Sequence, residues 1–304
     1  MPMFAAAAQL GRIQSMNGLS IIIAAHNEGG VIEQTLRSIL ANRFEGALQI
    51  VVVANGCRDD TAARAGNIDP RIEVVETEQA GKINALNLGD QAARYFPRAY
   101  LDADVQISDN VLEKIVAAFA DPGCRLAMPT ARHVYTGGNP VLAGYYQLWR
   151  SLPYVRQAVM GGGFYAIDRI MRSRFDKFPA ITADDKFIHS LAQPDERRIV
   201  PGCFVTVRMP RTFGALLRVK TRWTYGNLEL ASVFPQLQRN GHANYQGAAA
   251  HLLMRPWLWV NVPTFVFVYL YAQSAARRRL RQKNSLWDRD QSTRPLASQQ
   301  RPAA

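Results

Sequence analysis

The first hundred residues alternate between short apolar runs and amphipathic segments. Residues 19–25 form a continuous apolar run rich in isoleucine, which is typical of a strand covered on both faces. Residues 31–40 follow with apolar positions at helical spacing. The alternation then predicts strands over 48–53, 71–76 and 99–101, and helices over 59–65 and 82–95. This order predicts an α/β fold with a mostly parallel central sheet flanked by helices, whose ligands bind beyond the carboxyl ends of the strands.

The pattern is less regular after residue 121. It predicts helices over 140–157, 185–192 and 212–237, and strands over 161–167 and 199–208. The most apolar stretch is 256–272, which has tryptophan and tyrosine near its ends and is followed by RRRLRQK. We expect an apolar and basic helical extension at this point of the chain.

The composition narrows the class of protein. The chain has 304 residues, of which 48% are hydrophobic and 20% charged, which argues against a disordered, collagen-like or many-span membrane protein. The net charge of +12 is uneven, because residues 211–283 hold eleven basic residues and one acidic residue, Glu229. Such a region suits anionic lipid, nucleic acid or a phosphorylated substrate.

Acidic pairs stand where the predicted strands end. Asp102 and Asp104 follow the fourth strand, and carboxylates at this spacing suit a hard divalent cation that keeps waters and phosphate ligands. Asp184 and Asp185 form a second pair at the start of a predicted helix. Adjacent like charges raise the pKa of one member, as a general base requires.

Several segments in order resemble the family 2 glycosyltransferases, inverting enzymes of the GT-A fold that use nucleotide-diphosphate sugars. The resemblance covers about residues 19–230 and rests on LSIIIAAHNEGGVIEQTLRSIL, IVVVANGCRDDT, GKINALNLG, LDADV, GGGFYAIDR, ITADDKFI and RVKTRWTYGN. It implies a GT-A catalytic domain over 19–240, with a nucleotide-binding half (19–121) and an acceptor half (122–240).

The resemblance also implies roles for single residues. The nucleotide and donor sugar would contact Ala25, Asn27, Glu28, Asn55, Lys82, Asp102, Gly162, Gly163 and Arg222. Asp104, with Asp102, would bind Mg²⁺ or Mn²⁺. Asp185 would be the catalytic base, and Asp184 and Trp223 would contact the acceptor. Asn55 stands near where the family often has an aspartate that reads the base, which leaves the nucleotide open.

The expected reaction is the transfer of one sugar from a nucleotide-diphosphate donor to a glycan or lipid-linked acceptor in cell-surface glycan synthesis. Processive relatives carry Gln three residues before the Arg of the R-W pair, and this chain has Val219 there. The alternatives are a nucleotidyltransferase that releases pyrophosphate and a non-enzymatic basic module that binds lipid or nucleic acid. The acidic strand ends place nucleic acid last among the partners.

Residues 241–283 are predicted to associate with a membrane. The 17 residues of 256–272, interrupted by Asn261 and Pro263, are marginal for crossing the hydrocarbon core. An interfacial or re-entrant segment would keep the arginines and the catalytic domain on the cytoplasmic side, against anionic lipid. A single span and a buried core helix are the alternatives. Residues 1–18 are predicted to be a flexible lead-in and 284–304 a disordered tail.

Overall fold

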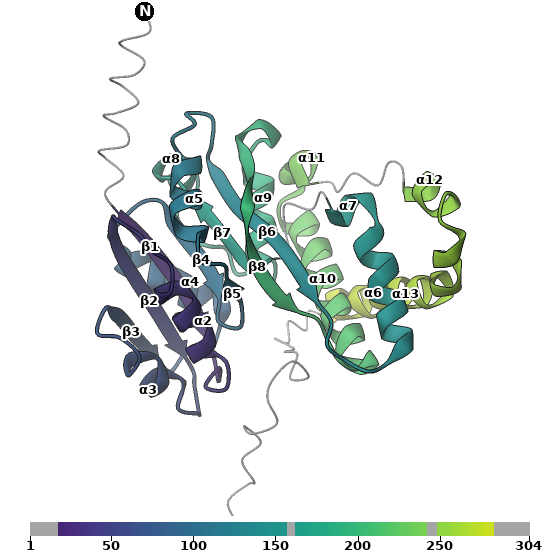
Figure 1. Ribbon diagram of the computed structural model, residues 1–304, viewed down its shortest axis with the longest axis horizontal. Helices are drawn as coiled ribbons and strands as arrows, with labels where there is room; N and C mark the ends of the chain where they lie inside the picture. Colours follow the sequence, from purple (N-terminus) through teal and green to yellow (C-terminus); the bar gives the residue numbers. More distant parts are fainter. Residues whose placement is uncertain (1–17, 157–161, 242–247, 283–304) are drawn as a thin grey trace, which may run out of the picture.

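The computed structural model describes residues 18–156, 162–241 and 248–282 (Figure 1). The predictions for the lead-in and the 284–304 tail therefore lie outside the described residues, apart from Gly18. Within the described part, eight strands form one sheet in the order β3-β2-β1-β4-β7-β6-β8-β5. Their bounds are β1 Gly18–Ala25, β2 Ala47–Asn55, β3 Ile72–Thr77, β4 Arg98–Asp102, β5 Gln106–Ile107, β6 Leu126–Val134, β7 Phe164–Ile167 and β8 Arg197–Arg208.

The first half of the sheet is parallel, as predicted. The pairs β1–β2, β1–β4 and β2–β3 are all parallel. The second half is mixed, because β7 runs antiparallel to β4 and β6, and β5 antiparallel to β8, while β6 and β8 are parallel. The carboxyl ends of β1, β2 and β4 therefore meet at one edge of the sheet, where Asn27, Asn55 and Asp104 lie at or just beyond the strand ends.

Helices cover both faces of the sheet (Figure 1). In the first half they are α2 Ile32–Leu40, α3 Thr61–Gly66, α4 Lys82–Ala92 and α5 Val111–Ala118. In the second half they are α6 Pro140–Ser151, α7 Pro153–Arg156, α8 Arg169–Arg172, α9 Asp184–Leu191, α10 Phe213–Val233, α11 Gln238–Gly241, α12 Ala248–Leu253 and α13 Val262–Arg281. Short 3₁₀ helices are η1 Pro194–Glu196, η2 Pro235–Leu237 and η3 Pro256–Asn261.

Several boundaries differ from the sequence prediction. The helix predicted over 140–157 ends at Ser151, because Leu152 is extended and Pro153 follows it. The 82–95 helix ends at Ala92. Strand β6 was not predicted, since it contains a proline at which its register with β8 shifts; proline within a run argues against a strand unless a bulge accommodates it.

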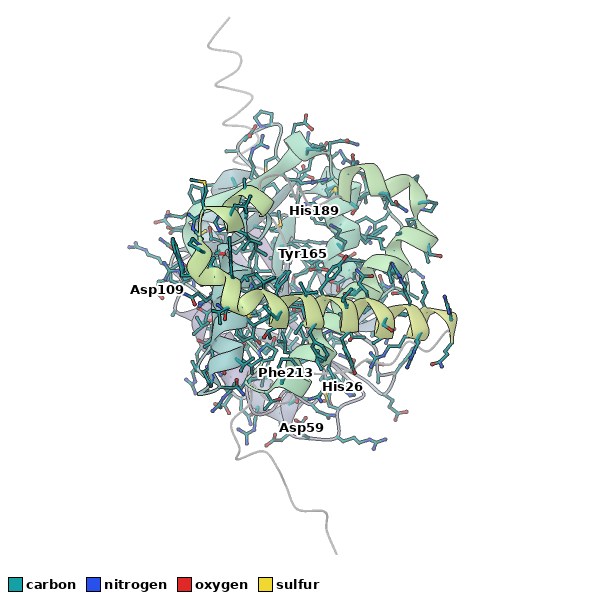
Figure 2. All side chains as sticks on the ribbon, turned by 90° about the vertical axis from the view of Figure 1, so that its right-hand side faces the viewer. His26, Asp59, Asp109, Tyr165, His189 and Phe213 are labelled. Atoms are coloured by element: carbon teal, nitrogen blue, oxygen red, sulfur yellow. The ribbon has the colours of Figure 1, made fainter. Side chains whose placement is uncertain are left out.

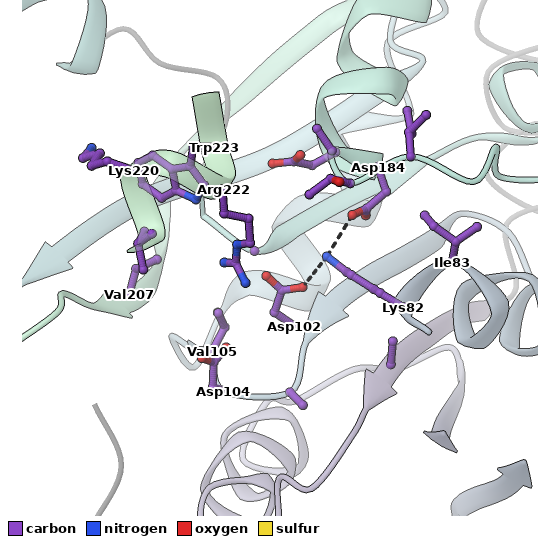
Figure 3. Close-up of a pocket in the computed structure, with 18 of the residues that line it drawn as sticks. Lys82, Ile83, Asp102, Asp104, Val105, Asp184, Val207, Lys220, Arg222 and Trp223 are labelled. Atoms are coloured by element: carbon purple, nitrogen blue, oxygen red, sulfur yellow. Dashed lines mark ion pairs between the residues drawn. The ribbon is translucent and has the colours of Figure 1, made fainter. Parts of the chain in front are cut away.

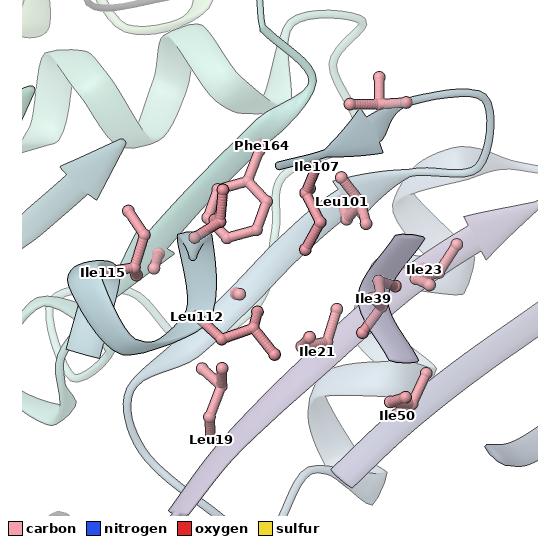
Figure 4. Close-up of a cluster of buried hydrophobic side chains, with 14 of the residues drawn as sticks. Leu19, Ile21, Ile23, Ile39, Ile50, Leu101, Ile107, Leu112, Ile115 and Phe164 are labelled. Carbon is pink, nitrogen blue, oxygen red and sulfur yellow. The ribbon is translucent and has the colours of Figure 1, made fainter. Parts of the chain in front are cut away.

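The core lies on both faces of the parallel strands. Ile21 and Ile23 of β1 face α2 and α5 in a cluster with Ile39 and Leu112 (Figure 4), whereas Ile22 faces the opposite side with Leu86 of α4. Both faces are buried, which explains the unbroken apolar run of β1.

The C-terminal helices pack on the second half of the described chain. Helix α13 lies against α10 and α6 and crosses the face turned to the viewer in Figure 2. The predicted 256–272 segment is divided at Asn261 into η3 and the first half of α13. Leu258 and Val268 are buried, but Trp257 is 63% exposed and Val260 78% exposed, so the alternative of a buried core helix is wrong. Among the described residues, no helix combines the length and apolar character needed to cross a bilayer.

Helix α4 approaches the sheet through Gly89, which predicts a stability defect on substitution. A Cβ at Gly89 would lie 2.4 Å from Ile22 Cγ2 and 3.2 Å from Val53 Cγ2. Gly89→Ala should therefore lower the free energy of unfolding by about 1–3 kcal/mol through overpacking, measured by urea denaturation. Gly66→Ala is the matched control, because its Cβ would meet only Val74 Cγ2 at 3.6 Å. Equal midpoints for the two variants would contradict the tight approach of α4.

Candidate active site

The main pocket opens beyond the carboxyl ends of β1 and β4. Its volume is about 470 Å³. Residues of β8, α9 and α10 also line it. Its charged and polar lining residues are Glu28, Lys82, Asp102, Asp104, Thr182, Asp184, Asp185, Arg208, Lys220, Arg222, Trp223 and Glu229.

Lys82 joins two of the predicted acidic pairs. It is the first residue of α4, and its Nζ lies 2.8 Å from Asp102 Oδ1 and 2.9 Å from Asp184 Oδ1 (Figure 3). The Tyr165 hydroxyl donates to the other oxygen of Asp184 at 3.1 Å. Burial opposes the charge of Lys82, but the carboxylates of Asp102 and Asp184 outweigh it and raise the pKa of Lys82 above its ordinary value. This bridge ties the end of β4 to the start of α9.

The pKa of Asp185 is raised, as expected of a general base. Burial and the negative charge of Asp184 raise the pKa of Asp185 to about 6, while Lys82 opposes the shift. The backbone N–H of Lys186 donates to Asp185 Oδ1 at 2.7 Å. Asp185 is thus oriented by the first turn of α9, and its ionised form is less stable than that of an ordinary aspartate.

Asp102 and Asp104 have the chemistry of a divalent-cation site. Both line the pocket, and Asp104 is exposed in the turn after β4. No cluster of three or more His, Cys, Asp or Glu residues able to hold a metal exists among the described residues. Two carboxylates are nevertheless a fitting set for Mg²⁺, which is usually held by one or two carboxylates together with waters and substrate phosphates.

Gly163 allows the backbone to pass close to Asp102. Its φ is +64°, and a Cβ would lie 2.8 Å from Asp102 Oδ2. The Asp102 N–H donates to the Gly163 carbonyl at 2.8 Å. Only glycine combines this backbone conformation with so close a contact, so Gly163 is required for the position of Asp102.

Four of the predicted donor residues do not line the pocket: Ala25, Asn27, Asn55 and Gly162. Asn55 is fully buried; its Nδ2 donates to the Ala25 carbonyl at 2.7 Å and its Oδ1 accepts from the Gly81 N–H at 2.9 Å. Asn27 accepts the Arg58 N–H through Oδ1 at 2.6 Å. Asn55 therefore holds the ends of β1 and β2 to the start of α4, and a contact of these residues with a donor stays a prediction.

Three polar residues of the site were missed in the sequence. Tyr165 orients Asp184 through its hydroxyl. Glu229 accepts the Thr182 N–H through Oε2 at 2.7 Å, which fixes the loop before α9. Lys220 stands three residues before Trp223, one helical turn away, and this spacing was the available signal.

Lys220 is the buried cation of the α10 wall. Its Nζ lies 4.0 Å from the ring centroid of Trp149 and 4.2 Å from that of Trp223. Burial lowers the pKa of Lys220 to about 7. Arg222, two residues on, extends instead toward Asp102 (Figure 3).

The chain is similar to known proteins over most of its length. Residues 20–163 match the family described as glycosyl transferase family 2. The poly-beta-1,6-N-acetyl-D-glucosamine synthase of Staphylococcus aureus (strain MSSA476) is 23% identical over 248 residues, which cover 72% of this chain and 56% of that protein. The chain thus spans little more than half the length of this relative.

Two solved structures have a similar fold. The mannosyltransferase PcManGT from Pyrobaculum calidifontis, in complex with GDP-Man and Mn²⁺, has a TM-score of 0.54 at 20% identity and covers 88% of this chain and 76% of that one. S. aureus TarS 1-349 in complex with UDP-GlcNAc has a TM-score of 0.51 at 14% identity, covering 91% and 98%. These similarities confirm the expected fold.

The raised pKa of Asp185 predicts a pH-dependent gain in stability when its charge is removed. Above pH 6 the ionised carboxylate destabilises the folded state, because its folded pKa exceeds the ordinary value of 3.8. Asp185→Asn should therefore increase the free energy of unfolding by about 1–3 kcal/mol at pH 7.5, and this gain should disappear as the pH falls to about 4. Urea denaturation at both pH values measures it.

The exposed Asp109, which does not line this pocket and is labelled in Figure 2, provides the control. Asp109→Asn should keep the wild-type urea midpoint at pH 7.5. A destabilised Asp185→Asn at pH 7.5 would show that the carboxylate is favourably paired in the folded state, and it would contradict burial and the charge of Asp184 as the dominant influences on Asp185.

Proposed function

We propose that this chain, which belongs to glycosyl transferase family 2 through residues 20–163 and has the GT-A fold, transfers a single sugar from a nucleotide-diphosphate sugar to an acceptor hydroxyl. The observation that carries the proposal is the arrangement of the main pocket. Asp102, Asp104 and Lys82 line it from the end of β4 and the start of α4, and Asp185, whose pKa is raised to about 6, lines it from the first turn of α9. Transfer from a metal-bound diphosphate donor needs carboxylates for the cation and a general base in one pocket.

We place the donor at the strand ends. Glu28 follows β1 and lines the pocket, where its carboxylate can accept hydrogen bonds from a ribose or a base. Lys82 and Arg222 supply positive charge for the diphosphate. PcManGT binds GDP-Man with Mn²⁺ and TarS binds UDP-GlcNAc, which supports a nucleotide sugar as the ligand of this pocket.

Asp104 and Asp102 would hold Mg²⁺ or Mn²⁺. The cation, when bound, neutralises the diphosphate leaving group as a Lewis acid. Lys82 contributes a second, permanent positive charge beside Asp102, since its ammonium stays protonated at all ordinary pH values. The pair with Lys82 also holds the Asp102 carboxylate in place at the end of β4.

Asp185 would take the proton from the attacking acceptor hydroxyl. An ordinary aspartate is a weak base at neutral pH; a pKa of about 6 leaves Asp185 ionised at pH 7.5 and brings its basicity closer to the working pH. Asp184 cannot share this role while Lys82 and Tyr165 hold both of its oxygens. We therefore assign Asp184 to positioning the start of α9. Its expected contact with the acceptor, together with Trp223, stays a prediction.

The acceptor is proposed to be a glycan or a lipid-linked saccharide of the cell surface. The named activity of the S. aureus relative, synthesis of a polysaccharide, supports this class. Val219 stands in place of the Gln of processive relatives, which favours transfer of one sugar at a time.

The test is a screen of nucleotide sugars for release of free nucleoside diphosphate. UDP-GlcNAc and GDP-mannose come first, each with and without Mn²⁺ and with membrane extract as the acceptor source. Metal-dependent release of UDP or GDP is expected. Release of pyrophosphate would instead support a nucleotidyltransferase, and no binding of any donor would support a non-enzymatic basic module.

Two substitutions test the assigned roles. Asp185→Asn should lower kcat by about 10²–10⁴-fold by removing the base, and Asp104→Asn should raise the Mn²⁺ concentration needed for half-maximal rate. For the wild type, kcat/KM should fall as the pH drops below about 6, because protonated Asp185 cannot accept a proton. Asp109→Asn is the control with wild-type rates. Full turnover by Asp185→Asn would remove this residue from the mechanism.

We also propose that η3 and α13 bind the inner, anionic face of a membrane. Aromatic residues are exposed on them, among them Trp257, Trp259 and Phe267. The exposed arginines Arg277, Arg278 and Arg281 follow at the end of α13. Tryptophan and tyrosine favour the membrane interface, and each arginine near an anionic surface contributes about 1 kcal/mol.

This surface predicts binding to anionic vesicles. The protein should sediment with vesicles of phosphatidylglycerol and phosphatidylcholine, and less with phosphatidylcholine alone. Replacing Arg277, Arg278 and Arg281 together by Gln should weaken binding to the anionic vesicles about 10²-fold. The matched control replaces Arg43, Arg58 and Arg71, which are exposed in the first half of the chain. Equal loss in both triple variants would mean that net charge alone, and not this surface, attracts lipid.

A further inference from the structure

The end of the main pocket away from Lys82 differs from the strand-end side in its charge. The end of β8 and the start of α10 supply apolar lining at this end: Val207, Met209, Pro210, Leu216 and Val219. The charged residues within this lining are Arg208 and Lys220, and both are cations. The four aspartates of the pocket lie at the end of β4, in the turn after it and in the first turn of α9.

Lys220 is deeply buried without a carboxylate partner. Its exposure is 9%, and none of the ion pairs within 4 Å among the described residues involves it. The faces of Trp149 and Trp223 contact its ammonium instead. The contrast with Lys82 is direct, because Lys82 lies in the same pocket and has two carboxylates within 3 Å.

The acidic residue of α10, Glu229, is already engaged. Glu229 accepts the Thr182 N–H through Oε2 and the Tyr225 hydroxyl through Oε1, at 2.7 and 3.2 Å. Arg208 donates to the neutral side chain of Gln34 at 2.9 Å. The protein therefore presents positive charge at this end of the pocket and leaves Lys220 uncompensated by any described acid.

A buried ammonium of this kind is destabilised until an anion reaches it. The tryptophan faces compensate part of the lost hydration, and burial still lowers the pKa of Lys220 to about 7. An anionic group entering the pocket would supply the missing counter-charge in a poorly hydrated place, where a charge-assisted hydrogen bond is strong. A neutral sugar would supply no counter-charge to the ammonium.

We propose that Lys220 forms an anion subsite in the acceptor end of the pocket, where it binds a carboxylate or phosphate group carried by the acceptor. This rests on the proposed function, which places the donor at the strand ends and so leaves this end for the acceptor. Trp149 and Trp223 hold the ammonium in place, and Arg208 adds a second positive charge. The acceptor is accordingly an acidic or phosphorylated saccharide.

The experiment compares sugars that differ only in charge. Glucuronic acid, glucose 6-phosphate and glucose are titrated into the full chain, and binding is followed by calorimetry and by tryptophan emission, since Lys220 contacts two indole rings. The wild type should bind one or both anionic sugars at least tenfold more tightly than glucose. Which anion binds better distinguishes a carboxylate acceptor from a phosphate acceptor.

Variants assign the preference to Lys220. Lys220→Met should bind the anionic sugars no better than glucose, while Lys220→Arg should keep most of the preference. Lys177→Met is the matched control, because Lys177 is exposed and does not line the pocket, and it should behave as the wild type. If Lys220→Met does not unfold cooperatively, Lys220→Gln replaces it in the comparison.

A wild type that binds glucose as tightly as both anionic sugars overturns the proposal, and so does an unchanged preference in the Lys220 variants. Titration with UDP and with GDP in the presence of Mn²⁺ reports on the donor end separately. Nucleotide binding without a preference for anionic sugars would reject the subsite and leave the glycosyltransferase function standing. A Lys220-dependent preference without nucleotide binding would support the anion site and reject the proposed function.

Discussion

The bridge from Lys82 to Asp102 and Asp184 is the interaction on which the arrangement of the pocket depends. These residues come from the start of α4, the end of β4 and the start of α9, and the two carboxylates would repel each other without the ammonium between them (Figure 3). Lys82 thus allows two acidic segments to share one pocket. The ammonium pairs with Asp184 and not with its neighbour Asp185. Asp184 therefore has a structural role, whereas burial and the charge of Asp184 raise the pKa of Asp185.

Several close backbone contacts surround this bridge. Gly163 passes against Asp102, Gly89 lets α4 lie directly on β1 and β2, and Asn55 holds the residue before Lys82 through the Gly81 N–H. Each of these contacts limits where α4 can lie relative to the strands. The position of the Lys82 ammonium is therefore set in part by packing and hydrogen bonds outside the pocket, at Gly89 and Asn55.

The C-terminal helices are joined to the same pocket through α10. That helix lines the pocket with Lys220, Arg222 and Trp223 and also packs against α13. The surface proposed for anionic lipid and the cation proposed for an anionic acceptor are thus joined by the packing of α10 against α13.

The sequence by itself determined the α/β class, the parallel order of the first strands and the identity of the acidic pairs, because continuous apolar strands and polar strand ends are local patterns. Only the tertiary structure determined which groups the polar and charged side chains contact. The side chain of Asn55 forms hydrogen bonds with the backbone, and Lys82 bridges Asp102 and Asp184. The ammonium of Lys220 contacts tryptophan rings instead of a carboxylate. The tertiary structure also divided the 256–272 segment at Asn261. The burial and pairing of a charged side chain depend on contacts between residues that are distant in the chain. Those contacts determine which of several similar charged residues is solvated, which is paired and which can bind a ligand.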